Sequence, residues 1–385
     1  MHNFRHLAPT AIEFGAGKLN NLGELTAPHG GRVLLVTESW EGPLGAIYAR
    51  AKESLQAARL SVVVYDRAQP NPTVATIDAG AAVAQDECIE AVIGIGGGST
   101  IDTAKGIAVA ATHPGSVWDY MYFQPSQPSA LTLPIIAVTT TSGTGAHATR
   151  YAVITKSDIE CKSAIAHDNV FPRVGLVDPE LMLGLPRAIT ASTSFDAFTH
   201  AFESYTNPAA TPMTDLLNLQ ALTLITANLE TVLADLGNLE GRAALAWADT
   251  LAGMCISNAG TTLPHAMGQP ISGHFPHVAH GQSLAVVYPP FLRFTCEAAA
   301  DKFTAVGRLL DPAVSDCHAA VEAMLAWMKR IGMYIGLCDI NVPEEGLAAV
   351  LKDCMAFPDV ACNPRVPDEA QVMAMYREAL TTATL

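Results

Sequence analysis

The stretch that decides the fold is Ala91-Val-Ile-Gly-Ile-Gly-Gly-Gly-Ser-Thr-Ile-Asp-Thr-Ala-Lys105. It leads from a short β-branched run, through three consecutive glycines, into a segment with helical spacing. Glycines let the backbone approach a ligand closely, and we expect Ser99 and Thr100 to cap the following helix, whose first N–H groups then point at an anion. The stretch therefore predicts a strand, a phosphate-binding turn and a helix, although many α/β proteins use such a turn without a ligand.

Short strands and helices alternate on both sides of this turn. We predict strands at Arg32–Thr37, Ser61–Tyr65, Ala91–Ile95 and Pro134–Thr139, helices over 45–58 and 74–85, and a hairpin or edge strand within 11–22. This alternation is typical of a doubly wound, mostly parallel sheet. After Pro186 the chain is rich in Ala, Leu and Met, which predicts helices over 213–236, 241–259, 318–331 and 344–357. We expect an α/β dinucleotide-binding domain over 1–185 and an all-α domain over 186–385.

Composition and charge exclude several classes of partner. The chain has 385 residues, is 50% apolar and 15% charged, and carries a net charge of -15, which disfavours nucleic acid and anionic membranes as partners. We see no signal peptide and no apolar run near the roughly 18 residues of a membrane helix. The eight cysteines are scattered without a Cys-x-x-Cys pair. We interpret them as small buried residues rather than disulfides or thiolate metal sites, and expect a cytoplasmic protein.

Two further features favour a nucleotide at the carboxyl ends of the strands. Glu38 follows the first predicted strand, where a carboxylate can bind ribose hydroxyls and repel a 2′-phosphate, favouring NAD over NADP; the alternative is a solvated loop end. A second loop, Thr139-Thr-Thr-Ser-Gly-Thr-Gly145, follows the Pro134–Thr139 strand. Two polar, glycine-containing loops on adjacent strand ends indicate a nucleotide site more strongly than either loop alone.

A set of carboxylate and imidazole side chains indicates a metal site in the second half. Asp196 and His200 are spaced i, i+4, so a helix places both on one face. His265 and His280 follow, and one carboxylate with three imidazoles suits Fe²⁺ or Zn²⁺. An isolated Asp/His pair is more often a surface or capping feature. His274 and His277 also lie in this segment, and spacing alone does not choose between His277 and His280.

In the order of these motifs the chain resembles the iron-containing (group III) alcohol dehydrogenase family over essentially its whole length. Pro70-Asn-Pro-Thr73, the glycine loop, the Thr139–Gly145 loop, Val177-Asp-Pro-Glu-Leu181, residues 186–203, His265 and His280-Gly281 carry the resemblance. It implies the dehydroquinate synthase-like fold of that family, with a metal in the cleft between the domains. The implied metal ligands are Asp196, His200, His265 and His280. The implied nucleotide residues are Glu38, Asn71, Gly97, Gly98, Ser99, Asp102, Thr139, Thr140, Thr144 and Lys162.

The resemblance implies an enzyme that passes hydride between NAD(H) and a small primary alcohol or aldehyde, with Fe²⁺ as the ion and a homodimer or larger homo-oligomer as the assembly. NADP and Zn²⁺ are the alternative cofactor and ion. We place His274, His277 and Gln269 in the catalytic wall, with one of the two histidines as a proton relay; a hydrogen-bonded cleft histidine is the other interpretation.

Departures from the family pattern concern the substrate wall. Ala146-His147 and Gln269 replace other residues common in relatives, and Pro270–Gly273 is similar to the hydroxyacid–oxoacid transhydrogenase branch, which points to a substrate with an acidic group. The alternatives are that transhydrogenase activity, a maleylacetate-reductase-like enzyme, a glycerol-type dehydrogenase, a dehydroquinate-synthase-like lyase, or a nucleotide-binding protein without turnover.

Overall fold

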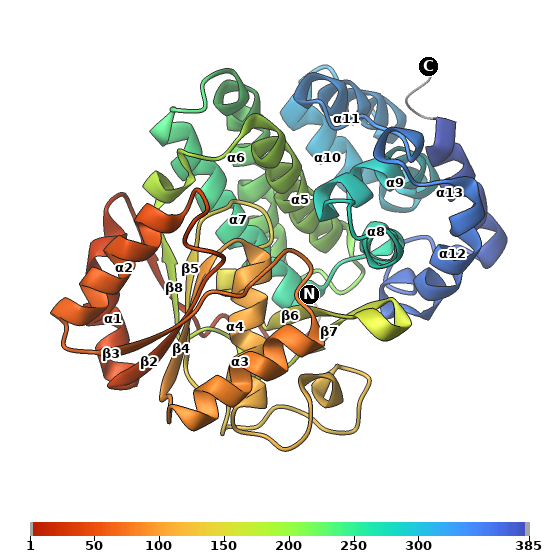
Figure 1. The fold of residues 1–385 in the computed structure, drawn as a ribbon. Coiled ribbons are helices and arrows are strands. Elements are labelled where there is room, and N and C mark those ends of the chain that lie inside the picture. The colour runs from red at the N-terminus through yellow and green to blue at the C-terminus, as the bar shows by residue number, and fades with distance from the viewer. Residues whose placement is uncertain (1–2, 382–385) are drawn as a thin grey trace. The chain divides into compact units, whose positions relative to one another are not determined.

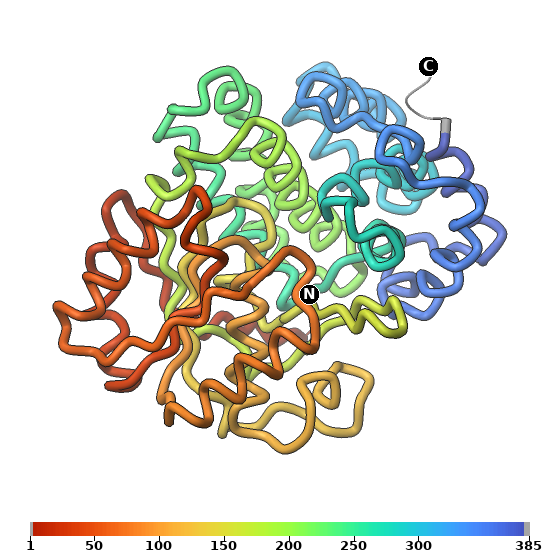
Figure 2. Tube along the Cα trace, viewed as in Figure 1, coloured from red at the N-terminus to blue at the C-terminus, as the bar shows by residue number. Residues whose placement is uncertain are grey.

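The computed structural model describes residues 3–381, which form two compact units (Figures 1 and 2). One unit spans residues 8–185, and the other begins at Pro186 and includes the segment that ends at Leu7. Leu7 is fixed there because its backbone N–H donates to the Asn258 side chain at 2.7 Å and its carbonyl accepts from the same side chain at 2.9 Å. The assignment of residues 1–185 and 186–385 as separate domains stays a prediction.

The first unit is built on six parallel strands in the order β1-β8-β5-β4-β2-β3. The strands are β1 (Ala11–Phe14), β2 (Arg32–Val36), β3 (Ser61–Tyr65), β4 (Ala91–Gly96), β5 (Ile135–Thr139) and β8 (Val174–Val177). Because β2 lies between β3 and β4, the chain leaves β2 on one side and returns on the other. The carboxyl ends of β2 and β4 therefore form the switch point at which open α/β sheets bind ligands.

Helices cover both faces of this sheet, and alternate strand residues point to each face. The helices are α1 (Leu22–Thr26), α2 (Gly45–Ala57), α3 (Val74–Asp86) and α4 (Gly98–Ala110). Val33 and Leu35 of β2 pack in a core with residues of α1 and α2, whereas Leu34 and Val36 pack in a core with residues of α3 and α4. Strands β2, β4, β5 and β8 are buried on both faces, which explains why they read as continuous apolar runs rather than as alternating ones.

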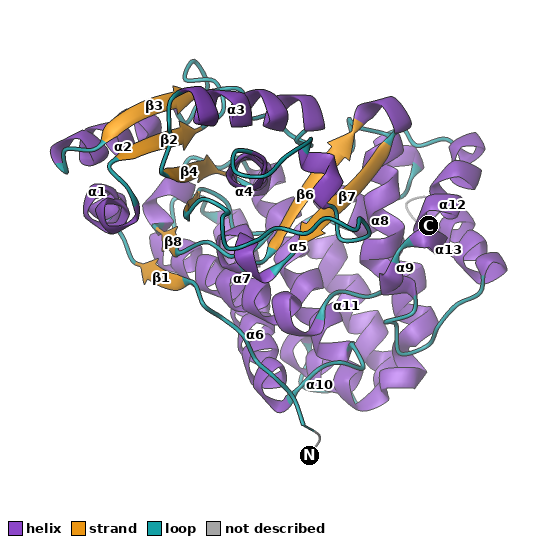
Figure 3. Cartoon of the chain, turned by 90° about the horizontal axis from the view of Figure 1, so that it is seen from below, coloured by secondary structure: helices purple, strands orange, loops and turns teal. Residues whose placement is uncertain are grey.

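An antiparallel hairpin that we did not predict stands apart from the main sheet, as Figure 3 shows. Its strands are β6 (Tyr151–Lys156) and β7 (Cys161–Ala166), and it lies in the first unit. For residues 11–22 we predicted a hairpin or an edge strand. The structure has a parallel edge strand, β1, followed by helical turns. The predicted doubly wound sheet is confirmed.

The regular elements of the second unit are all helices among its described residues. Its helices are α5 (Arg187–Thr206), α6 (Pro212–Ala234), α7 (Leu239–Ala259), α8 (Leu263–His274), α9 (His280–Thr295), α10 (Ala300–Leu310), α11 (Cys317–Ile331), α12 (Leu347–Ala356) and α13 (Glu369–Thr381). One continuous core joins them, with Phe195, Phe198 and Phe202 of α5 near its centre against Trp327 and Tyr288. The predicted all-α region after Pro186 is confirmed.

Helix α6 is the one described helix whose length and composition would allow it to cross a membrane. The sequence predicted no membrane helix, because polar residues interrupt the apolar run of α6. Only 39% of its most apolar window is buried, but the helix packs against α5 and α7, and Thr211 caps its N-terminus. Length and apolarity alone do not distinguish a membrane helix from a packed helix of this kind.

Candidate active site

The glycine loop of the first unit lies between β4 and α4 at the switch point. Gly97 is the N-cap of α4 and no side chain bonds there, so the prediction that Ser99 and Thr100 cap the helix is wrong: both lie in its first turn. Glycine at the cap leaves room for an anion beside the first N–H groups of the helix. A Cβ on Gly98 would lie 2.5 Å from Cγ2 of Thr144, so only glycine fits at this point.

The second loop lies directly beside the glycine loop, as predicted for adjacent strand ends. Gly96 and Thr139 are paired in the register of β4 and β5, and the Thr140 N–H donates to the Gly96 carbonyl at 3.0 Å. The Thr139 hydroxyl donates to the Thr141 carbonyl at 2.7 Å, and the Thr144 hydroxyl accepts from the Ala146 N–H at 3.2 Å. These hydroxyls therefore shape the loop itself, which holds its backbone against Gly98.

Glu38 follows β2 at the same edge of the sheet. Burial raises the pKa of its carboxyl above the ordinary value, and the nearby Thr100 hydroxyl lowers it. The contact with Thr100 places Glu38 beside the first turn of α4. From there its carboxylate can reach the ribose of a nucleotide bound at the glycine loop.

Three of the predicted nucleotide residues, Asn71, Asp102 and Lys162, contribute polar groups around α4 and the hairpin. Lys162 of β7 donates to the Asn71 side-chain oxygen at 2.9 Å, and Asp102 of α4 accepts from the Val153 N–H at 3.0 Å. Burial is the main cause that raises the pKa of Asp102, while Lys105 and Lys162 lower it. The structure thus brings together residues that the sequence places up to 91 positions apart.

The metal candidates of the second unit converge on one oxygen atom. Asp196 and His200 lie on α5, His265 lies in the first turn of α8, and His280 is the first residue of α9. The Nε2 atoms of His200 and His280 each lie 3.7 Å from Oδ1 of Asp196. The Nε2 atom of His265 lies 3.9 Å from that same oxygen. Ligand atoms of Asp196, His265 and His280 lie within 4.8 Å of one another, and His200 joins them through Asp196.

These distances suit a shared cation better than direct hydrogen bonds. They exceed the usual 2.7–3.2 Å of an N–H···O bond, whereas two ligand atoms about 2.1 Å from one tetrahedral ion lie about 3.4 Å apart. Asp196 is only 3% exposed, and a buried carboxylate is costly unless positive charge compensates it. The donor set of one carboxylate and three imidazoles therefore fits a divalent transition-metal ion.

Glu203, which sequence reasoning did not assign to the site, orients His265. Its Oε1 lies 2.8 Å from Nδ1 of His265, and its Oε2 accepts from the Thr262 N–H at 2.9 Å. A proton on Nδ1 leaves the Nε2 lone pair facing Asp196, so this contact selects the tautomer that a metal ligand needs. Glu203 is fully buried, and although burial raises its pKa, the hydrogen bonds from Thr262 and His265 lower it and favour the ionised form that accepts from both. Its i, i+7 spacing from Asp196, two turns along α5, is the signal that could have identified it.

Gly281 permits the close approach that brings His280 to Asp196. A Cβ on Gly281 would lie 2.2 Å from the Ser192 carbonyl oxygen, so a larger residue would push the start of α9 away from α5. The His280-Gly281 pair is therefore a packing requirement as well as a motif.

The three candidates for the catalytic wall lie outside this four-residue cluster. His274 Nε2 lies 2.8 Å from Oδ2 of Asp353, and His277 Nε2 lies 3.0 Å from the Ile340 carbonyl. Gln269 is one turn after His265 on α8, and its side-chain oxygen is buried without a hydrogen bond among the described residues. Between His277 and His280, the structure brings His280 to Asp196. A proton-relay role for either His274 or His277 stays a prediction.

Comparison with known proteins connects both halves of the chain to the same enzymes. Residues 9–179 match the family model of iron-containing alcohol dehydrogenases, and residues 190–380 match the model of their C-terminal region. The chain is 33% identical to 1,3-propanediol dehydrogenase of Klebsiella pneumoniae, covering 98% of each chain. It is 32% identical to the NAD-dependent methanol dehydrogenase of Bacillus methanolicus, covering 99% of this chain and 100% of that one.

A solved structure agrees with these matches. The archaeal halo-thermophilic Red Sea brine pool alcohol dehydrogenase ADH/D1 superposes with a TM-score of 0.94 at 32% identity, covering 99% of this chain and 100% of that chain.

Proposed function

Because the chain belongs to the iron-containing alcohol dehydrogenase family, an oxidoreductase family that uses NAD(H) and Fe²⁺, we propose that it interconverts a small primary alcohol and its aldehyde. We propose Asp196, His200, His265 and His280 as the ligands of the ion. The single observation that carries this assignment is the convergence of three imidazole Nε2 atoms on one Asp196 oxygen, at 3.7–3.9 Å.

When bound, Fe²⁺ supplies Lewis-acid stabilisation of negative charge on the substrate oxygen, and the nicotinamide gives or takes the hydride. The residues of this chain supply the fixed geometry that this chemistry requires. Glu203 holds the His265 ring in one tautomer and one orientation, and Gly281 lets α9 carry His280 to Asp196. Because Asp196, His200 and His265 are buried, the packed surroundings hold their side chains in place.

We propose that the glycine loop holds the pyrophosphate of the nucleotide through Gly97, Gly98 and Ser99. Glu38 supports a preference for NAD, because its carboxylate would repel the 2′-phosphate of NADP. The other predicted nucleotide residues, which lie in the Thr139–Gly145 loop and at Asn71, Asp102 and Lys162, would contact the rest of the nucleotide. A cytoplasmic location and a homodimeric or larger assembly are also part of this proposal, and they rest on the family resemblance.

The buried Gln269 oxygen favours a substrate that offers a hydrogen-bond donor, such as the second hydroxyl of a diol. The names of two relatives, 1,3-propanediol dehydrogenase and methanol dehydrogenase, support small primary alcohols. A substrate with an acidic group is the second candidate, supported by the Pro270–Gly273 stretch.

A substrate panel tests the proposal. The metal-free protein is reloaded with Fe²⁺ or Zn²⁺ and assayed on short alcohols, diols, hydroxyacids and their carbonyl forms, with NAD(H) and NADP(H). We expect metal-dependent turnover of a small primary alcohol or diol, with a higher kcat/KM for NAD than for NADP. Turnover of hydroxyacids alone would show that the substrate carries an acidic group and is not a simple alcohol or diol. Equal turnover with and without metal would contradict the proposed centre.

Replacing Glu203 by glutamine is expected to weaken Fe²⁺ binding about 10- to 100-fold, the usual cost of losing an outer partner of a metal-bound histidine. Both carboxylate oxygens of Glu203 accept hydrogen bonds, and a glutamine amide must present an NH₂ to one of these donors. Competition with a chelator measures the affinity. Glu230→Gln, which changes an exposed residue paired with Arg330, is the matched control. An unchanged Fe²⁺ affinity in Glu203→Gln would show that Glu203 does not position His265.

A further inference from the structure

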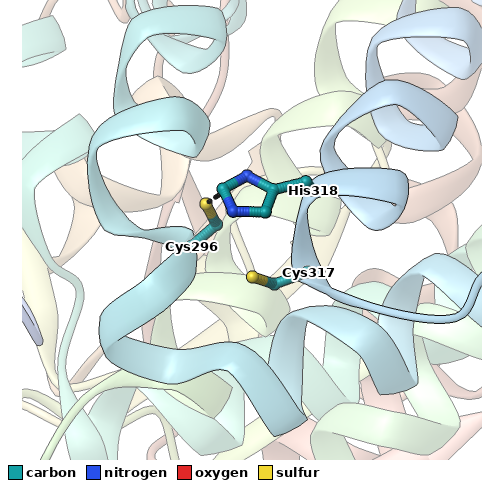
Figure 4. A group of neighbouring side chains, drawn as sticks. All are labelled: Cys296, Cys317 and His318. Atoms are coloured by element: carbon teal, nitrogen blue, oxygen red, sulfur yellow. Dashed lines mark hydrogen bonds between the residues drawn. The ribbon is translucent and has the colours of Figure 1, made fainter.

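A second group of metal-binding side chains lies in the helical unit, away from the residues assigned above. Cys296 begins the short 3-10 helix η8 (Cys296–Ala299) at the end of α9, and Cys317 and His318 are the first two residues of α11. The ligand atoms of these three residues all lie within 4.8 Å of one another. Figure 4 shows that the three side chains point toward one another from two different segments.

We propose that Cys296, Cys317 and His318 form a second metal site, which binds Zn²⁺ through two thiolates and one imidazole. The geometry is close to what a tetrahedral ion requires. Two thiolates about 2.3 Å from one Zn²⁺ ion lie about 3.8 Å apart, and a thiolate and an imidazole nitrogen lie about 3.6 Å apart. The Cys296 sulfur lies 3.8 Å from Nδ1 of His318, so the ion needs only small movements of side chains.

The surroundings of the three residues favour a cation with thiolate ligands. Cys296 is 1% exposed and Cys317 is 7% exposed, so two thiolates there need a positive charge beside them. A divalent ion balances that charge, and the two thiol protons leave to solvent when it binds.

A further contact orients the imidazole for this role. The Nε2 atom of His318 lies 3.4 Å from Oε1 of Glu297, while Nδ1 faces the Cys296 sulfur. A proton on Nε2 leaves the Nδ1 lone pair for the metal; compared with Glu203 and His265, the two ring nitrogens exchange roles and the carboxylate contact is longer and exposed. The His318 side chain is 69% exposed, so water can reach the fourth position of the ion.

The ligand types assign different metals to the two sites. Thiolates select Zn²⁺ over Fe²⁺, whereas the Asp196 cluster offers only nitrogen and oxygen. Cys296 and Cys317 are buried, as we expected of the cysteines, and the proposal adds a metal-binding role to them. The expectation of burial is wrong for Cys88 and Cys338, which are exposed. A metal at this site would link the end of α9 to the start of α11.

The inference does not depend on the proposed dehydrogenase function.

Cobalt substitution tests the site on the full-length protein. Co²⁺ is added to metal-free protein kept reduced with a phosphine, and the absorption spectrum is recorded. We expect a thiolate-to-cobalt charge-transfer band, which the Asp196 cluster cannot produce, and Zn²⁺ added in excess over both sites should remove it. Absence of the charge-transfer band from the reduced wild-type protein would overturn the proposal.

Variants separate the site from other thiols and from the active centre. Cys317→Ser should abolish the charge-transfer band, and His318→Ala, at an exposed position, should weaken Zn²⁺ binding by more than about tenfold while alcohol oxidation is unchanged. Cys338→Ser, at an exposed cysteine in another segment, is the matched control and should keep the band. Asp196→Ala should keep it as well. A band of equal intensity in wild type and Cys317→Ser would overturn the assignment.

Discussion

Replacing Asp196 by alanine is expected to lower the turnover of alcohols by about a thousandfold or more, with NADH binding unchanged. Three imidazole nitrogens converge on the Asp196 oxygen, so its removal takes away the one negative ligand and the point around which the others are arranged. Loss of the ion removes several kcal/mol of transition-state charge stabilisation, and each 1.36 kcal/mol is a factor of ten in rate. Steady-state kinetics, metal analysis and NADH fluorescence titration measure the three effects.

Asp301→Ala provides the control for this experiment, because Asp301 is an exposed aspartate on α10 of the same unit. It should keep wild-type metal content and turnover. His265→Ala should behave like Asp196→Ala, since both remove a proposed ligand. Turnover that survives either change at the wild-type level would show that the reaction takes place elsewhere.

Replacing Gly98 by valine is expected to raise the Kd for NADH about a hundredfold or more while the Fe²⁺ content stays at the wild-type level. A Cβ at this position would lie 2.5 Å from Cγ2 of Thr144, so the valine must push the Thr139–Gly145 loop and the start of α4 apart. A displacement of about 1 Å in an element that positions a ligand reduces function by about a hundredfold. NADH titration and metal analysis of the purified variant provide the measurement.

Gly184→Val is the matched control, because no atom lies within 4 Å of a Cβ placed on Gly184, in an exposed loop of the same unit. It should bind NADH normally. A Gly98→Val protein that is folded by circular dichroism and binds NADH with wild-type affinity would remove the glycine loop from the nucleotide site. Asp196→Ala should lose the metal and keep nucleotide binding, whereas Gly98→Val should lose nucleotide binding and keep the metal. This is expected because the two sites are built in different units of the chain.

Local sequence was sufficient to predict the architecture. The strands β2 to β5 were predicted to within one or two residues, because each is a β-branched run bounded by turn residues, and such signals need no distant partner. The same holds for the change to helices after Pro186. The hairpin of β6 and β7 was missed, because each strand has only six residues and the second, CKSAIA, mixes polar and apolar side chains without strict alternation.

The helical spacing of Asp196 and His200 was likewise readable from the chain, because an i, i+4 pair lies on one helix face whatever surrounds it. The choice of His280 over His277 rested on family resemblance, since no local rule separates the two. The capping role given to Ser99 and Thr100 was wrong because backbone geometry placed Gly97 at the cap.

Sequence alone therefore determined the order of the elements, the glycine loop and the residue types available for a metal, because these depend on neighbours in the chain. Tertiary packing decided which side chains meet. Glu203 reaches His265 across 62 positions, and Cys296 meets His318 across 22, only because separate helices pack together. A contact between helices depends on their packing geometry, and no periodicity within either helix encodes it.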